Sequence, residues 1–147
     1  MIYRIVPASF NPLFEVVGCF LDADGEILLL RRNPEKSEGG KWGVPGGKID
    51  SGETRKEAMI RELQEETGYA IQEERLGYID TLHVEHPRHQ FVYHLFTAQL
   101  DSKPVIALNP HEHQQYLWVK PPEALMLDLV TDVDGCIAIV YAPGKER

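Results

Sequence analysis

The sequence is poor in basic residues and in long apolar runs. Among its 147 residues, 15 Lys and Arg stand against 23 Asp and Glu, so the formal net charge is −8. A general nucleic-acid or membrane-surface binder needs a basic patch, and this balance argues against both classes. No apolar run approaches the roughly 20 residues of a membrane span, and the first residues lack the apolar core of a signal peptide. A small anionic ligand stays open, because a bound divalent cation reverses the field of converging carboxylates.

Cysteine is also scarce. Cys19 and Cys136 are far apart and each lies in an apolar stretch, so we expect two buried free thiols and a reducing, cytoplasmic location. The sequence has no internal repeat, low-complexity tract or Ser/Gly linker, and 43% of it is hydrophobic. These features predict one soluble globular domain over residues 1–147.

The residue pattern predicts several strands and one strong helix. Asp-Gly at positions 24–25 separates two apolar, partly β-branched runs, which is typical of a hairpin. Residues 54–67 are rich in good helix formers, with Thr54 and Glu57 as a capping box and Gly68 at the C-terminal end. Strands before and after a single strong helix predict a mixed α/β or α+β sandwich. The expected strands span residues 14–21, 27–30, 42–44, 76–84, 91–100 and 116–119.

Two segments leave alternatives open. Residues 131–142 fit either a helix or a buried strand, and we prefer a helix capped by Thr131, although Gly135 interrupts it. The histidines at 83, 86 and 89 surround a proline, and a strand followed by a turn does not bring them together. Loop surface is therefore favoured over a metal site for these three.

The surplus acid is concentrated between residues 47 and 69. At about 100° per residue, Glu62, Glu65 and Glu66 share one face of the expected helix, within roughly a third of its circumference. Like charges at this spacing each cost a helix about 0.2–0.5 kcal/mol, and the helix dipole disfavours them near the C-terminus. A site for hard divalent cations, which prefer carboxylate oxygens, explains the arrangement. The alternative is a solvated acidic helix face, which is the commoner origin of such a cluster.

The flanking residues extend this cluster into a longer pattern. Gly47 is followed after five residues by Glu53, and after seven more by residues 61–69, Arg-Glu-Leu-Gln-Glu-Glu-Thr-Gly-Tyr. This spacing resembles the Nudix box, and only Tyr69 departs from it, where an aliphatic residue is usual. A match at every fixed position is a specific signal, unlike a lone glycine motif. Trp-Gly-Val-Pro-Gly-Gly at 42–47 and Leu-Leu-Leu-Arg-Arg at 28–32 also look like the family.

The resemblance implies a Nudix hydrolase, with an α/β/α sandwich around a mixed β-sheet, that cleaves a diphosphate linked to another moiety. Mg²⁺ is the implied cofactor, with Mn²⁺ as the alternative. Glu53 and Arg61 match the pair that supports and orients the loop and the helix. The implied metal ligands are Glu62, Glu65, Glu66, the Gly47 carbonyl and, through water, Glu53.

The general base that deprotonates the attacking water has three candidates. Glu62 comes from the box, whereas family members often use an acidic residue or a histidine from a loop before a late strand. In this chain that loop offers Glu112 and His113, and an ordinary loop histidine is the alternative for His113. The stretch from His113 to Trp118 is similar to one in the GDP-mannose hydrolases of the family. Those enzymes depart from the usual box, so their substrate is not carried over. Arg61 and Glu65 are further candidate catalytic residues.

The substrate side has weaker markers. Arg31 and Arg32 are candidates to contact terminal phosphates as fork-shaped donors, with ordinary surface charge as the alternative. Gly46 and Gly47, which allow a tight backbone turn, are placed in the same substrate-binding set. Several aromatic residues are candidates for base stacking, although most such residues belong to cores. They include Phe14, Phe91 and Tyr93.

The favoured function is a divalent-metal-dependent pyrophosphohydrolase that acts on a nucleoside triphosphate or a nucleoside diphosphate derivative by attack of water at phosphorus. ADP-ribose or nucleotide-sugar hydrolysis is the close alternative. A Nudix-fold sensor that binds a nucleotide without cleaving it belongs to another class, and the complete set of glutamates disfavours it. We expect a small-molecule nucleotide partner and neither nucleic acid nor membrane. Dimers are frequent in the family, which leaves a homodimer as an open expectation.

Overall fold

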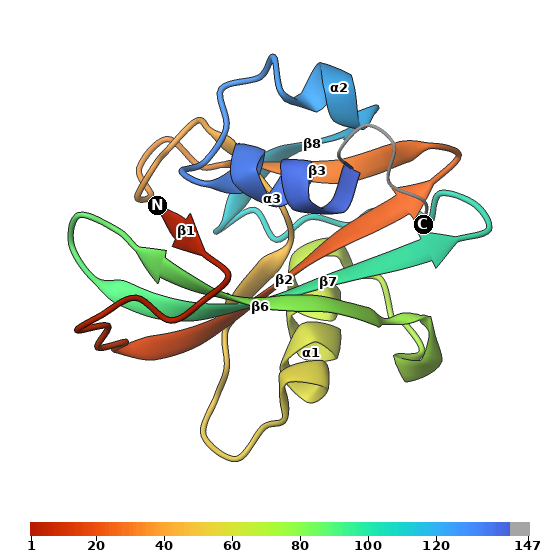
Figure 1. The fold of residues 1–147 in the computed structure, drawn as a ribbon. Helices are drawn as coiled ribbons and strands as arrows, with labels where there is room; N and C mark the ends of the chain where they lie inside the picture. The colour runs from red at the N-terminus through yellow and green to blue at the C-terminus, as the bar shows by residue number, and fades with distance from the viewer. Residues whose placement is uncertain (142–147) are drawn as a thin grey trace.

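The fold is built on one mixed sheet. The structure is a computed structural model that describes residues 1–141. The eight strands are β1 (Ile2–Tyr3), β2 (Phe14–Ala23), β3 (Glu26–Arg32), β4 (Trp42–Gly43), β5 (Gly46–Lys48), β6 (Gly77–Glu85), β7 (Gln90–Leu100) and β8 (His113–Val119). Their order is β1-β6-β7-β2-β3-β4, with β5 paired to β2 and β8 paired to β3 (Figure 1). Strands β2 and β7 run parallel and the other strand pairs are antiparallel, so the expected mixed sheet is confirmed.

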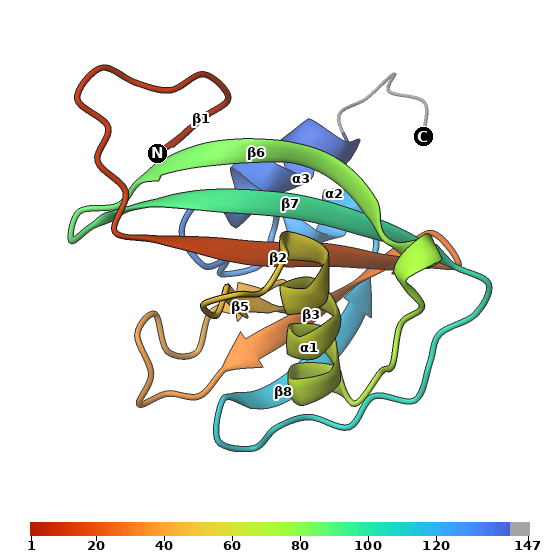
Figure 2. The same ribbon diagram turned by 90° about the horizontal axis from the view of Figure 1, so that it is seen from below.

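The short pairing between β2 and β3 allows the sheet to separate into two arms. Asp24 and Gly25 in the turn of this hairpin have φ of 55° and 76°, the left-handed pair that a tight two-residue turn requires. The two strands pair only at the two positions nearest this turn. Beyond them β2 pairs with β5 and β7, whereas β3 pairs with β4 and β8. The sheet therefore opens into two arms, with β6, β7 and β2 in one and β3 and β8 in the other (Figure 2).

Helices cover both faces of this sheet. They are α1 (Arg55–Thr67), α2 (Pro121–Ala124), α3 (Val133–Tyr141) and the 3₁₀ helix η1 (Glu73–Arg75). Helix α1 lies on one face, and α2 and α3 lie on the other (Figure 1). Side chains along β3 point alternately to the two faces of the sheet. Leu28 and Leu30 belong to the core cluster that contains α1 residues, whereas Ile27 and Leu29 belong to the cluster that contains α3 residues. The architecture is therefore the expected α/β/α sandwich.

Both predicted ends of α1 are confirmed. The Thr54 side chain accepts a hydrogen bond from the Glu57 N–H, and the Glu57 carboxylate accepts one from the Thr54 N–H, which completes the capping box. Gly68 ends the helix with φ of 74°, and its N–H donates to the Gln64 carbonyl. These local interactions set where the acidic face of the helix begins and ends.

The ambiguous segment 131–142 is a helix, but Thr131 does not cap it. The Thr131 N–H and hydroxyl both donate to Glu38, and α3 begins after Asp132, whose carbonyl accepts from the Cys136 N–H. Gly135 lies inside the helix, and a Cβ there would be 2.7 Å from the Ile2 Cδ1 atom, so a larger residue would require the Ile2 side chain to move. Ala142 lies outside the described residues.

The two cysteines are free and buried, as expected, and they lie on opposite sides of the sheet. Cys19 belongs to the core under α1, and Cys136 is an α3 residue in the core between that helix and the sheet. Within residues 1–141, none of the helices has the length and apolarity to cross a membrane. Elements that the sequence pattern missed are β1, β5, η1 and α2, each of two to four residues.

Candidate active site

A pair of glycines brings the backbone of β5 against α1 and β2. Gly46 faces Gly18 across the β2–β5 ladder, and a Cβ on Gly46 would lie 2.1 Å from the Val17 carbonyl oxygen. A Cβ on Gly47 would lie 2.4 Å from the carboxyl carbon of Glu62. A side chain at Gly46 would therefore push the turn away from β2, and one at Gly47 would displace the Glu62 carboxylate.

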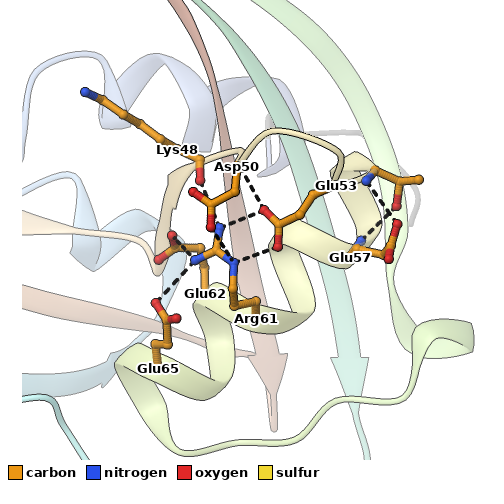
Figure 3. A network of polar contacts seen from close by, with 8 residues as sticks. Lys48, Asp50, Glu53, Glu57, Arg61, Glu62 and Glu65 are labelled. Atoms are coloured by element: carbon orange, nitrogen blue, oxygen red, sulfur yellow. Dashed lines mark hydrogen bonds and ion pairs between the residues drawn. The ribbon is translucent and has the colours of Figure 1, made fainter.

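Arg61 ties the loop after β5 to α1. Its guanidinium contacts Glu53 in a two-pronged ion pair, with Nε to Oε2 at 2.7 Å and Nη2 to Oε1 at 2.9 Å (Figure 3). Nη2 also donates to the Lys48 carbonyl at 3.0 Å, and Glu53 accepts the Asp50 N–H at 2.8 Å. The Arg61 hydrogen bonds and the Asp50 N–H together lower the pKa of Glu53 to about 2. This geometry supports the orienting role predicted for the pair.

The same guanidinium reaches two of the predicted metal ligands. Arg61 Nη1 donates to Glu62 at 2.9 Å and to Glu65 at 3.3 Å (Figure 3). The Glu62 side chain is only 13% exposed, whereas that of Glu65 is 56% exposed. Burial raises the pKa of Glu62 in spite of the Arg61 contact.

Glu66 is the most deeply buried member of the acidic cluster, with 6% of its surface exposed. Both of its carboxylate oxygens accept the Gly46 N–H, at 3.2 and 3.3 Å. Burial raises the pKa of Glu66 well above its ordinary value, and the charges of Glu62 and Glu112 raise it further. A carboxylate is therefore held against the glycine turn in surroundings that disfavour its charge.

The donor set at this turn suits a hard divalent cation. Carboxylate oxygens and a backbone carbonyl are the ligands that Mg²⁺ and Mn²⁺ prefer, and a cation would relieve the repulsion between Glu62 and Glu66. Among residues 1–141, however, no three acidic, histidine or cysteine side chains converge into a ready-made ligand cluster. Arg61 instead holds Glu62 and Glu65. The residues fit the cation by chemistry, and the ligand assignment stays a prediction.

A cavity of about 600 Å³ opens beside the glycine turn. One wall is aromatic: the Phe14 and Phe91 rings stack with centroids 5.4 Å apart, and the His89 ring lies 5.1 Å from Phe14. The opposite side comes from β4 and from the start of α3. Of the predicted substrate-side residues, the cavity is lined by Arg32, Gly46, Gly47, Phe14, Phe91 and Tyr93.

Arg32 and His113 line the cavity together, because they are paired across β3 and β8. The Arg32 Nε donates to the Ser37 carbonyl at 2.6 Å. His113 is only 7% exposed, and its Nδ1 is buried without a hydrogen-bond partner among the described residues. Burial and the Arg32 charge lower the pKa of His113 to about 4, so the imidazole is neutral near pH 7. Its neighbour Glu112 does not line the cavity, and its carboxylate lies 3.5 Å from the Lys36 ammonium.

Arg31 is not brought to the cavity. Its guanidinium donates to the Gly40 carbonyl and the Gln115 side chain and lies 5.9 Å from the Trp42 ring centroid. The β3–β8 register shifts between Arg31 and Arg32, and of these two arginines only Arg32 lines the cavity.

His86 and His89 lie in the loop between β6 and β7, as the pattern favoured. Both also line the cavity, which the pattern did not predict. Their backbones exchange hydrogen bonds, His86 N to His89 O at 2.9 Å and the reverse at 3.2 Å. This tight turn stacks the two rings at 5.0 Å and places them at the end of the aromatic wall.

Some residues that line the cavity could not be predicted from any motif or spacing in the sequence. Glu38 and Thr131, whose side chains are hydrogen-bonded to each other, both line it, as do Val130 and Val133. These contacts join segments about 90 residues apart, and spacing rules describe only neighbours within a few residues.

Comparisons with known proteins identify the family. The NUDIX domain family model matches residues 12–138. The CTP pyrophosphohydrolase of Escherichia coli is 32% identical over 126 residues, which cover 80% of this chain and 83% of that protein. The 8-oxo-dGTP diphosphatase of Escherichia coli is 34% identical over 89 residues, which cover 60% of this chain and 67% of that protein. The crystal structure of the MutT protein from Methanosarcina mazei has a TM-score of 0.76 and 26% identity, covering 92% of this chain and 98% of that one. The chain therefore belongs to the Nudix family, as a MutT-like hydrolase of phosphoric anhydride bonds.

Proposed function

We propose that this chain hydrolyses a nucleoside triphosphate or a nucleoside diphosphate linked to another moiety, with the help of a divalent cation. The observation that carries the proposal is a single cavity that joins an aromatic wall to the glycine turn beside the buried carboxylates. An aromatic wall suits a planar base, and a turn flanked by acidic side chains suits a cation with its phosphates. Two similar proteins, the CTP pyrophosphohydrolase and the 8-oxo-dGTP diphosphatase, are named for nucleoside triphosphates.

The residues divide by the part of the substrate that they face. Phe14, Phe91 and His89 stack beside the base, while Arg32 and the backbone of Gly46 and Gly47 face the phosphates. Arg32 is a donor that stays charged at any working pH, which suits a phosphate oxygen.

The cation is proposed to bind Glu62, Glu65, Glu66 and the Gly47 carbonyl, with Glu53 acting through water. When bound, it neutralises phosphate charge and lowers the pKa of an attacking water. Arg61 positions Glu62 and Glu65 while Glu53 fixes Arg61 against the loop. Mg²⁺ is proposed as the ion, with Mn²⁺ as the alternative.

Three residues stay as candidates for the base that accepts a proton from water. Glu62 is buried beside the glycine turn, and its raised pKa makes it a better proton acceptor than an ordinary glutamate. His113 is neutral near pH 7 and lines the cavity, so its unprotonated ring is also available. Glu112 lies next to the cavity but not on its wall. Removal of the true base should abolish the acidic limb of the pH–rate profile, whereas the other two variants keep it.

The test is a substrate panel with Mg²⁺ or Mn²⁺ and with products identified. The panel contains nucleoside triphosphates, oxidised ones, ADP-ribose, nucleotide sugars and dinucleoside polyphosphates. We expect hydrolysis of a nucleoside triphosphate, and a fall of about 100-fold or more in Glu65→Gln and Glu66→Gln. Glu74→Gln, in the exposed η1, is the matched control and should keep full activity.

Each contrary result has a distinct meaning. Equal rates in Glu65→Gln, Glu66→Gln and the parent chain would show that the ligand assignment is wrong. Preferential cleavage of ADP-ribose or a nucleotide sugar would replace the triphosphate by the alternative substrate class. Nucleotides that bind without any cleavage would support the sensor hypothesis instead.

A further inference from the structure

The phenol hydroxyl of Tyr93 occupies an unusual place in the cavity. Tyr93 lies on β7 and lines the cavity opposite the start of α3. A Cβ on Gly18 would lie 1.8 Å from the Tyr93 Oη and 2.6 Å from its Cζ, so the absence of a side chain at Gly18 makes room for the hydroxyl. Gly18 is the partner of Gly46 in the β2–β5 ladder. The hydroxyl therefore lies against the strand partner of Gly46, whose N–H donates to Glu66.

Among residues 1–141 this hydroxyl makes no hydrogen bond, and because the one fully enclosed unpaired side-chain atom there is His113 Nδ1, the Tyr93 Oη is open to the cavity. Two other tyrosine hydroxyls do have partners, since Tyr141 donates to Asp22 at 3.1 Å and Tyr78 bonds to Thr81. A tyrosine hydroxyl that faces a cavity without a protein partner is available to a ligand that enters the cavity. Burial raises the pKa of Tyr93 well above its ordinary value, so the group stays a neutral O–H that can donate and accept.

The neighbours of Tyr93 indicate which part of a ligand lies beside it. The centroids of the stacked Phe14 and Phe91 rings are 5.4 Å apart, and those of the Phe91 and Tyr93 rings are 6.5 Å apart. The hydroxyl also lies against Gly18, whose Cα would be 3.0 Å from a Cβ on Gly46, and the Gly46 N–H donates to Glu66. A ligand with its base on the phenylalanine rings and its phosphates at the turn has its sugar and first phosphate next to the Tyr93 hydroxyl.

We propose that the Tyr93 hydroxyl is a substrate-binding group that hydrogen-bonds an oxygen of the ribose 5′-phosphate unit of the nucleotide. This contact rests on the proposed function and deepens it, because it fixes the distance between the base and the anhydride that is cleaved. Gly18 is then a specificity residue as well, since only glycine leaves room for the hydroxyl.

The test compares Tyr93→Phe with the parent chain. We expect kcat/KM for the best nucleotide of the panel to fall about tenfold, as for loss of one hydrogen bond in a closed site. The unfolding midpoint without ligand should not fall, because the hydroxyl has no partner within residues 1–141. Tyr116→Phe is the matched control: Tyr116 is 45% exposed and outside the cavity, so both quantities should stay unchanged.

A second readout does not depend on turnover. The α,β-methylene analogue of the nucleotide, which is not cleaved at that bond, should raise the melting temperature of Tyr93→Phe less than that of the parent chain. An undiminished shift together with a parental kcat/KM overturns the proposal. A shift that is reduced in Tyr93→Phe, in a chain that cleaves no nucleotide, supports the contact while refuting the proposed hydrolysis.

A 2′,3′-dideoxy substrate then locates the acceptor. If the loss in Tyr93→Phe persists with this substrate, the contact is to a phosphate oxygen or the ring oxygen. If the loss disappears, the contact is to a sugar hydroxyl. Both results support a bond to the ribose 5′-phosphate unit.

Discussion

Glu65 and Glu66 are adjacent in the chain and yet differ sharply in environment. Glu65 is more than half exposed, whereas Glu66 is buried and accepts the Gly46 N–H. Helical spacing correctly places both on the acidic side of α1, but it does not tell which of them the sheet covers. The difference arises because β5, a three-residue strand, passes over Glu66.

The buried carboxylate predicts how stability depends on pH. The folded pKa of Glu66 is raised well above the unfolded value of 4.5, so the folded state binds more protons over the range between them. Stability without metal should therefore fall as pH rises above the unfolded value, and Glu66→Gln should flatten this slope. Urea unfolding at several pH values measures it. Glu65→Gln keeps the buried carboxylate and should retain the parental slope; the same slope in Glu66→Gln would contradict the prediction.

At the scale of elements, α1 is the part that the sequence describes best. Its capping box and its terminal glycine are interactions between residues three or four positions apart, and both appear as predicted. Arg61 and Glu53, eight residues apart, connect this helix to the preceding loop. The short strands and helices that the pattern missed have too few residues to show any periodicity.

The cap of α1 predicts a measurable loss of stability. Thr54→Ala removes the acceptor for the Glu57 N–H and should lower the free energy of unfolding by about 1 kcal/mol. Thr54→Ser keeps a hydroxyl in place and should remain close to the parent chain. Denaturant unfolding followed by circular dichroism tests both variants. An unchanged midpoint in Thr54→Ala would mean that solvent replaces the cap at no cost.

At the scale of the whole molecule, the cavity is made by segments that are distant in the sequence. The aromatic wall comes from β2 and β7, the polar end from β3, β5 and β8, and the opposite side from the start of α3. The sheet opens into two arms beyond the β2–β3 hairpin (Figure 2), and residues of both arms line the cavity.

The two core layers predict different thiol reactivity. Cys19 is fully buried under α1, and burial raises its pKa, so a thiol reagent should label it only through global unfolding. Cys136 lines the cavity, and burial raises its pKa to about 12, so it should react slowly and be protected by bound nucleotide. Mass spectrometry of labelled protein at increasing urea distinguishes the two sites. Rapid labelling of Cys19 in the native protein would contradict its place in the core.

Local sequence patterns were enough to predict helix α1 with both of its ends, the hairpin, and the spacing that identifies the family, because each depends on residues close along the chain. The folded structure was needed to show that Arg32 and not Arg31 faces the cavity, that His86 and His89 belong to its wall, and that the Tyr93 hydroxyl lies over Gly18. These placements depend on which face of each strand is covered and on pairing between distant strands. Long-range packing fixes both, and no local spacing rule contains that information.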